Sequence, residues 1–161
     1  MKTLLLMRHA KSSWKDLSLA DHDRPLNRRG RNAAELMGEF LNNQDLVPEA
    51  ILCSTAKRAK QTVNFLLHTL SFGGEVYFTR DLYHSGSDAY LQELHKLDSG
   101  VSVVMLVAHN PGMESAIEDF CGEWERMPTA AIARIDFEII DWSEVDYDLG
   151  DLKVVWRPKE I

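Results

Sequence analysis

Apolar residues are distributed along the chain in two patterns, short continuous runs and longer segments with helical spacing. The continuous runs cover residues 3–8, 50–53 and 101–108, and runs of this length are typical of strands buried on both faces. Glu75–Thr79 predicts a further strand, because its apolar positions alternate and a pair of glycines precedes it. Four strands are therefore expected in this part of the chain.

Segments between these runs carry apolar residues three and four positions apart, which is the spacing of one helix face. Asn27 is expected to cap the first helix, Ser87 the third and Asn110 the fourth, with Pro111 at the first helical position of the last. The expected buried faces, in chain order, are Ala33, Met37, Phe40 and Leu41; Ala59, Val63, Leu66, Leu67 and Leu70; Leu91, Leu94 and Leu97; and Ile117, Phe120 and Cys121.

Two more strands are predicted near the end of the sequence. Residues 133–139 alternate apolar side chains with Arg134, Asp136 and Glu138, which predicts a strand with one face in water, and residues 154–156 are expected to pair nearby. The alternation of strands and helices indicates an α/β fold, a three-layer α/β/α sandwich with a mainly parallel central sheet and antiparallel strands late in the chain. The length of 161 residues favours a single domain over 1–161.

Composition and charge narrow the class of protein. Hydrophobic residues make up 45% and charged residues 27%, as in an ordinary soluble protein, and Cys53 and Cys121 are expected to be reduced core residues. The formal net charge of −7 would repel a phosphate backbone, so nucleic acid is not an expected partner. No apolar run approaches the roughly 20 residues of a membrane span, and residues 3–7 are too short for a signal sequence. A cytoplasmic protein without a membrane partner is expected.

Three of the predicted strands are followed by polar residues suited to phosphate chemistry. Arg8-His9 follow the first strand, Ser54 and Arg58 the second, and His109 the strongest apolar run. Ligands of open α/β sheets bind at the carboxyl ends of the strands, where these residues would meet. A neutral imidazole is a competent nucleophile toward phosphorus, and arginine binds phosphate oxygens with two parallel hydrogen bonds. Each residue alone has an ordinary structural explanation, but their joint placement indicates a site for phosphoryl transfer.

The same residues belong to motifs that resemble the histidine phosphatase superfamily. The motifs are Arg8-His9-Ala10, then Ser54-x-x-x-Arg58-Ala59-x-Gln61-Thr62, and then His109-Asn110-Pro111-Gly112. Two further stretches resemble the SixA-type phosphohistidine phosphatase branch, namely Arg8-His9-Ala10-Lys11-Ser12 and Asp23-Arg24-Pro25-Leu26. The resemblance covers roughly residues 2–122 and implies a phosphoglycerate mutase-like fold and a phosphohydrolase that needs neither a metal nor a cofactor.

The resemblance also implies roles for individual residues. His9 would carry the phosphoryl group as a phosphohistidine intermediate, and the phosphate pocket would consist of Arg8, Arg58 and His109. Lys11, Ser12 and Asn110 lie beside these motifs and are expected to contact the phosphate or the substrate. The superfamily commonly has glycine where this chain has Ala10, so the loop after His9 must avoid positive φ angles.

The proton donor for the leaving group is the residue that the motifs identify least. Asp23 is the first candidate, with Asp21, Asp81 and His84 as alternatives, and Asp23 is equally explained by a pairing with a neighbouring arginine or a capped turn. Without a strong acid the enzyme would favour a leaving group that needs little help, such as an imidazole.

The expected substrate is therefore phosphohistidine in a protein. A small phosphorylated molecule, hydrolysed by a broad phosphomonoesterase of the same superfamily, is the first alternative. A catalytically silent module that only binds phosphoproteins is the second.

Overall fold

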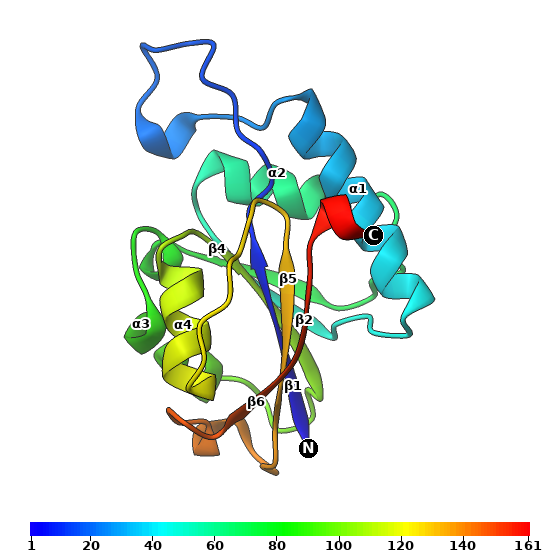
Figure 1. The fold of residues 1–161 in the computed structure, drawn as a ribbon, viewed down its shortest axis with the longest axis vertical. Coiled ribbons are helices and arrows are strands. Elements are labelled where there is room, and N and C mark those ends of the chain that lie inside the picture. The colour runs from blue at the N-terminus through cyan, green and yellow to red at the C-terminus, as the bar shows by residue number, and fades with distance from the viewer.

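The computed structural model describes residues 1–161 and contains six strands and four α-helices (Figure 1). The strands are β1 (Lys2–Arg8), β2 (Ala50–Ser54), β3 (Glu75–Thr79), β4 (Val103–Ala108), β5 (Ile132–Phe137) and β6 (Gly150–Trp156). The helices are α1 (Arg28–Asn43), α2 (Lys57–Leu66), α3 (Ser87–His95) and α4 (Gly112–Cys121), and short 3-10 turns lie at Asp21–Asp23, Arg80–Leu82, Trp142–Glu144 and Pro158–Glu160. None of the helices could span a membrane, because each is too short or too polar.

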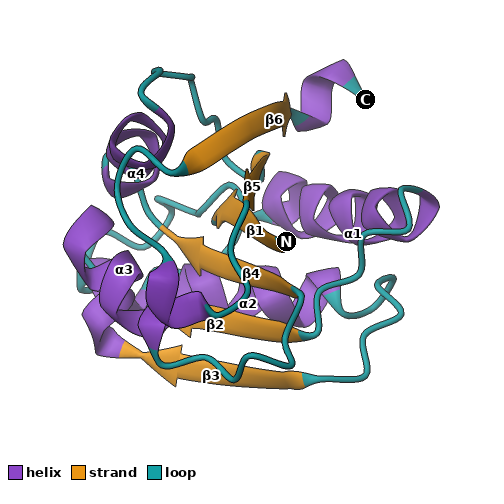
Figure 2. Cartoon of the chain, turned by 90° about the horizontal axis from the view of Figure 1, so that it is seen from below, coloured by secondary structure: helices purple, strands orange, loops and turns teal.

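The strands form one sheet in the order β3-β2-β4-β1-β5-β6. The first four strands of that order run parallel, whereas β5 is antiparallel to β1 and β6 is antiparallel to β5. Figure 2 shows α3 and α4 on one side of the sheet and α1 on the other. The predicted three-layer sandwich with a mainly parallel sheet is confirmed.

Each face of the sheet is covered by its own apolar cluster, and β1 contributes to both. Leu4 and Leu6 pack with side chains of α3 and α4, while Leu5 and Met7 pack with side chains of α1 and α2. All four are fully buried, and burying a side chain of this size contributes about 1.5–3 kcal/mol. This two-sided burial explains why β1 is a continuous apolar run, and it holds the end of β1 rigidly in place.

Two predicted helix starts differ from the structure, while the first is confirmed. Asn27 caps α1, since its side-chain oxygen accepts a hydrogen bond of 2.9 Å from the Gly30 N–H. Ser87 is instead the first residue of α3, and its hydroxyl donates to the Asp119 carboxylate of α4. Pro111 precedes α4 rather than occupying its first position. The Ser87 hydroxyl is engaged with Asp119 and does not cap its own helix, and α4 begins one residue later than predicted.

The prediction of a water-facing side on residues 133–139 is wrong for Asp136. Its side chain is buried, and its carboxylate accepts hydrogen bonds from the Thr3 hydroxyl at 2.8 Å and from Arg134 at 3.2 and 3.1 Å. The reason is that the Thr3 hydroxyl of the neighbouring strand β1 and the Arg134 guanidinium lie against this carboxylate and shield it from water. The strand also ends at Phe137, two residues earlier than predicted.

Candidate active site

The two histidines meet because β1 and β4 are adjacent parallel strands. Arg8 is paired with Ala108 in the register, so His9 and His109 leave the sheet side by side. The His9 N–H donates to the Ala108 carbonyl at 3.0 Å, and the two imidazole centroids are 5.1 Å apart. The carboxyl end of β2 lies on the other side of β4 and leads into α2, which carries Arg58. Sheet topology therefore assembles residues that are far apart in the sequence.

His9 is buried and held in one tautomer. Its Nδ1 lies 2.7 Å from the Ala10 carbonyl oxygen, which can only accept, so the proton of the neutral ring is on Nδ1. Arg58 Nε donates to His9 Nε2 at 3.4 Å, as expected for a nitrogen with a free lone pair. Burial, and to a lesser degree the charge of Arg58, lowers the pKa of His9 to about 3. The ring is thus neutral near pH 7.

The loop after His9 accommodates alanine without strain. Ala10 is fully buried and is absent from the residues with positive φ, in agreement with the expectation for this position. Its N–H donates to the Thr62 hydroxyl at 2.9 Å, and that hydroxyl donates to the Arg58 carbonyl at 2.7 Å. The helix that carries the arginine is therefore tied to the loop that carries the histidine.

His109 is buried against the end of β2. Its Nε2 lies 2.8 Å from the Ser54 hydroxyl oxygen. Burial, followed by the proximity of His9, lowers the pKa of His109 to about 3, so this ring is also neutral near pH 7. Ser54 is fully buried and accounts for the serine in the second motif.

Asp21 lies at the centre of a polar network on the pocket wall. Its backbone carbonyl and its carboxylate accept hydrogen bonds from Arg58 at 2.8 and 3.0 Å. The carboxylate also accepts from the Tyr83 hydroxyl at 2.6 Å and lies 3.4 Å from His84 Nε2 and from Arg24 Nε. Partial burial alone would raise the pKa of Asp21. The hydrogen bonds from Tyr83 and Arg58 outweigh this effect and lower the pKa to about 2. Asp21 is ionised at neutral pH and orients the guanidinium of Arg58.

These side chains surround a cavity of about 310 Å³. Of the residues expected from the sequence, the cavity is lined by Arg8, His9, Lys11, Ser12, Arg58, His109 and Asn110, and of the alternative acids by Asp21 and His84. Asp23 does not line the cavity. Its side chain is 66% exposed and lies 3.8 Å from His22. Asp81 is exposed on the 3-10 turn that follows β3 and does not line it either.

Two lining residues were not expected from the sequence, Arg24 and Thr129, and Trp14 lines the cavity with them. The Arg24 guanidinium stacks 3.5 Å from the centre of the Trp14 ring, a cation–π contact at the pocket rim. Arg24 could have been identified from the sequence, because it belongs to the Asp-Arg-Pro-Leu stretch. Thr129 could not, because it comes from a loop beyond the motifs.

The charges of the cavity are opposite to those of the whole protein. Arg8, Lys11, Arg24 and Arg58 face one carboxylate, Asp21, in a chain of net charge −7. Arg8 is held by a hydrogen bond of 3.1 Å to the Met127 carbonyl, and burial lowers its pKa. No group of three or more His, Cys, Asp or Glu side chains is arranged to hold a metal ion. The cavity is suited to a small, strongly anionic group beside a neutral imidazole nitrogen.

Comparisons with known proteins agree with this chemistry. The family described as the histidine phosphatase superfamily (branch 1) matches residues 4–83. An uncharacterised protein of Mycobacterium tuberculosis is 34% identical over 140 residues, which cover 79% of this chain and 84% of that protein. Phosphohistidine phosphatase SixA of Escherichia coli is 29% identical over 141 residues, or 84% and 85% of the two chains. A solved structure, provisionally named phosphohistidine phosphatase SixA, from Nakamurella multipartitia superposes with a TM-score of 0.87 at 25% identity, covering 98% of this chain and 96% of that one.

Proposed function

Because this chain belongs to the histidine phosphatase superfamily and is a phosphatase, we propose that it removes phosphate from phosphohistidine in proteins through a phosphohistidine intermediate on His9. The observation that carries the proposal is the state of His9: a buried neutral ring whose Nδ1 proton is held by the Ala10 carbonyl. Its Nε2 lone pair lies in a cavity with three arginines. The name and likeness of the SixA relatives support phosphohistidine as the substrate class.

In the first step, His9 Nε2 attacks phosphorus and the phosphorus–nitrogen bond of the substrate breaks. The leaving imidazole keeps the electron pair of that bond and takes up a proton. Arg8 and Arg58 donate to the phosphoryl oxygens and stabilise the charge that is spread over them during transfer. As the ring of His9 becomes positive, its hydrogen bond to the Ala10 carbonyl strengthens.

In the second step, water attacks the phosphorus of the intermediate. The bond to Nε2 breaks, its electron pair returns to the ring, and the proton of the water leaves with the phosphate or passes to solvent. His9 is then neutral again with its proton on Nδ1. The neutral His109, held by Ser54, is placed beside His9 to donate to a phosphoryl oxygen.

The proton for the leaving group is assigned here to His84. This residue lines the cavity, lies 3.4 Å from the ionised Asp21 and has a φ of 52°, a backbone conformation that is strained for histidine. Asp21 itself is a poor proton donor at neutral pH, because its pKa is about 2. A proton supplied by an imidazole group is adequate for an imidazole leaving group but weak for an alkoxide.

The test is phosphate release from a phosphohistidine-bearing protein in excess chelator, with wild type and His9→Ala compared. Release by wild type, with a loss of at least about 10⁴-fold in His9→Ala, is expected. Equal release by both proteins would mean that His9 is not the nucleophile. Release from an alkyl phosphate at a comparable rate would favour the broad phosphomonoesterase instead. A thermal unfolding curve of His9→Ala checks that the variant is folded.

A further inference from the structure

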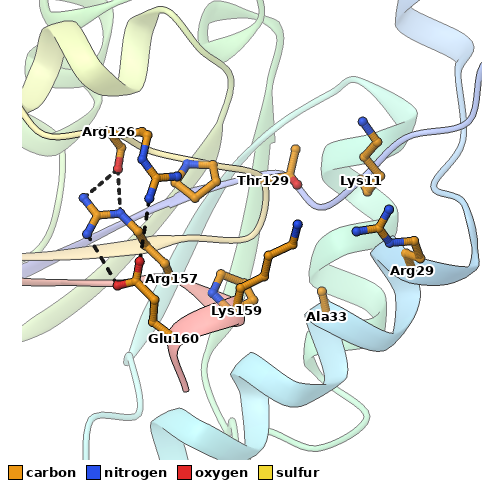
Figure 3. Close-up of a pocket in the computed structure, with 10 residues that line it drawn as sticks. Lys11, Arg29, Ala33, Arg126, Thr129, Arg157, Lys159 and Glu160 are labelled. Atoms are coloured by element: carbon orange, nitrogen blue, oxygen red, sulfur yellow. Dashed lines mark hydrogen bonds and ion pairs between the residues drawn. The ribbon is translucent and has the colours of Figure 1, made fainter.

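A second cavity, of about 570 Å³, lies beside the catalytic one and is larger. Lys11 and Thr129 line both cavities, so the two share a wall. Its other walls come from the first turns of α1, the loop before β5 and the segment after β6 (Figure 3). Because the two cavities are neighbours, groups that flank a phosphate in the catalytic cavity would lie close to the second one.

The second cavity is strongly basic. Five of its ten lining residues are cations: Lys11, Arg29, Arg126, Arg157 and Lys159. Its one carboxylate, Glu160, lies 3.6 Å from Arg126 and 3.7 Å from Arg157, and these three form the connected group in Figure 3. Its apolar lining consists of Ala33, Pro128 and Pro158. We call this cavity the basic pocket.

Three cations of the basic pocket have no anionic partner. Lys11, Arg29 and Lys159 make no ion pair, and their side chains donate no hydrogen bond to a protein atom within the structure. In Figure 3 the Arg29 guanidinium and the Lys159 ammonium group point toward one another, and Lys11 lies above them. Like charges gathered in this way repel one another, and an anion between them would remove that cost.

The position of Arg29 strengthens this argument. It lies in the first turn of α1, where the helix dipole disfavours a cation, and that turn contains no acidic residue. Gly30 lets this turn approach the backbone of the active-site loop, since a Cβ there would be 2.1 Å from the Lys11 carbonyl oxygen. The fold therefore brings Arg29 close to Lys11 in spite of an unfavourable charge arrangement.

We propose that the basic pocket binds carboxylate side chains that flank the phosphohistidine of the protein substrate. This inference rests on the proposed function and adds a criterion by which the enzyme would select its protein substrate. Pockets for small molecules usually have few charged groups, whereas half of the residues that line this one are cations and its unpaired cations are exposed. Clustered surface cations beside a catalytic site are suited to steering and orienting an acidic protein surface. On an enzyme of net charge −7, this local patch would also decide which face an acidic partner approaches.

The test compares two phosphohistidine peptides, one with glutamates on both sides of the phosphohistidine and one with glutamines in their place. Wild type is expected to show a lower KM for the acidic peptide. In Arg29→Gln/Lys159→Gln the KM for that peptide should rise roughly fivefold, as expected for two exposed ion pairs, with little change in kcat. The matched control is Lys96→Gln/Lys153→Gln, which removes the same charge from two exposed lysines outside both cavities. It should keep the wild-type preference.

A wild type without preference between the peptides, or a preference that survives in Arg29→Gln/Lys159→Gln, would overturn the inference. Binding of the unphosphorylated peptides, followed by fluorescence anisotropy, gives a readout that needs no turnover. If wild type hydrolyses neither peptide, the proposed function fails, and the anisotropy of the acidic peptide still decides the inference. Binding that is equal for the two peptides would then overturn it as well.

Discussion

Replacing Asp21 by asparagine should destabilise the protein by an amount that depends on pH. The carboxylate lies 3.0 Å from an Arg58 nitrogen and accepts a 2.6 Å hydrogen bond from Tyr83. Its pKa falls from 3.8 to about 2, which corresponds to roughly 2.4 kcal/mol if taken in full. The side chain is 42% exposed, so solvent screening reduces the expected contribution to about 1 kcal/mol.

The sign of the pH dependence follows from the lowered pKa. The folded state holds Asp21 ionised at pH values where the unfolded chain binds a proton, so the stabilisation is complete above about pH 5 and is lost as the pH falls toward 2. Roughly half of it should remain at pH 3. The difference in unfolding free energy between wild type and Asp21→Asn should shrink accordingly.

Urea unfolding followed by tryptophan fluorescence at pH 7, 5, 4 and 3 measures this difference. Asp23→Asn is the matched control, because Asp23 is two residues away, 66% exposed and outside the cavity. It should change the unfolding free energy by less than about 0.5 kcal/mol at every pH. A difference for Asp21→Asn that stays constant from pH 7 to pH 3, or equal effects of the two substitutions, would refute the assignment of Asp21 as the partner of Arg58.

Two further predictions concern the nucleophile and the helix beside it. Because the pKa of His9 is about 3, the rate of intermediate formation should not fall near pH 6.5, as it would for a histidine nucleophile with an ordinary pKa. Single-turnover rates measured from pH 7 to pH 5 check this. A tenfold fall in rate that follows a pKa near 6.5 would contradict it. Gly30→Ala should lower the free energy of unfolding by about 2 kcal/mol, because its Cβ would collide with the Lys11 carbonyl and better helix propensity offsets only part of that cost. In the same urea titration Gly73→Ala, with no atom within 4 Å, should be near neutral, and equal effects of the two alanines would argue against the close approach.

The elements of the fold could be predicted because their physical causes are local. A strand covered on both faces must be apolar throughout, as β1 is, and a helix that covers one face must repeat its apolar residues every three or four positions. The rule that ligands bind at the carboxyl ends of parallel strands then brought His9 and His109 together. The rule places two residues together only if their strands are neighbours in the sheet. The alternation of strands and helices strongly restricts the possible strand orders.

Parts of the site depend on contacts that leave no local pattern. Asp21 and Asp23 both belong to one Asp-x-Asp stretch, and only the 3-10 turn that packs against α2 makes the first of them the partner of Arg58. Asp136 was expected in water because strand alternation reveals that two faces exist but not that both are covered. Thr129 reaches the pocket through a loop after α4, whose course is determined by packing against β1.

The central position of β1 in the sheet has a consequence for how the protein is made. β1 and His9 leave the ribosome before β4 and His109, which follow about a hundred residues later. At about 5–20 residues per second, the nascent chain would wait roughly 5–20 s for the strand that completes the pocket. During that interval Leu4 to Met7 are an apolar segment without a sheet. Chaperones that act on emerging chains are therefore expected to bind the nucleophile-bearing strand before any substrate does.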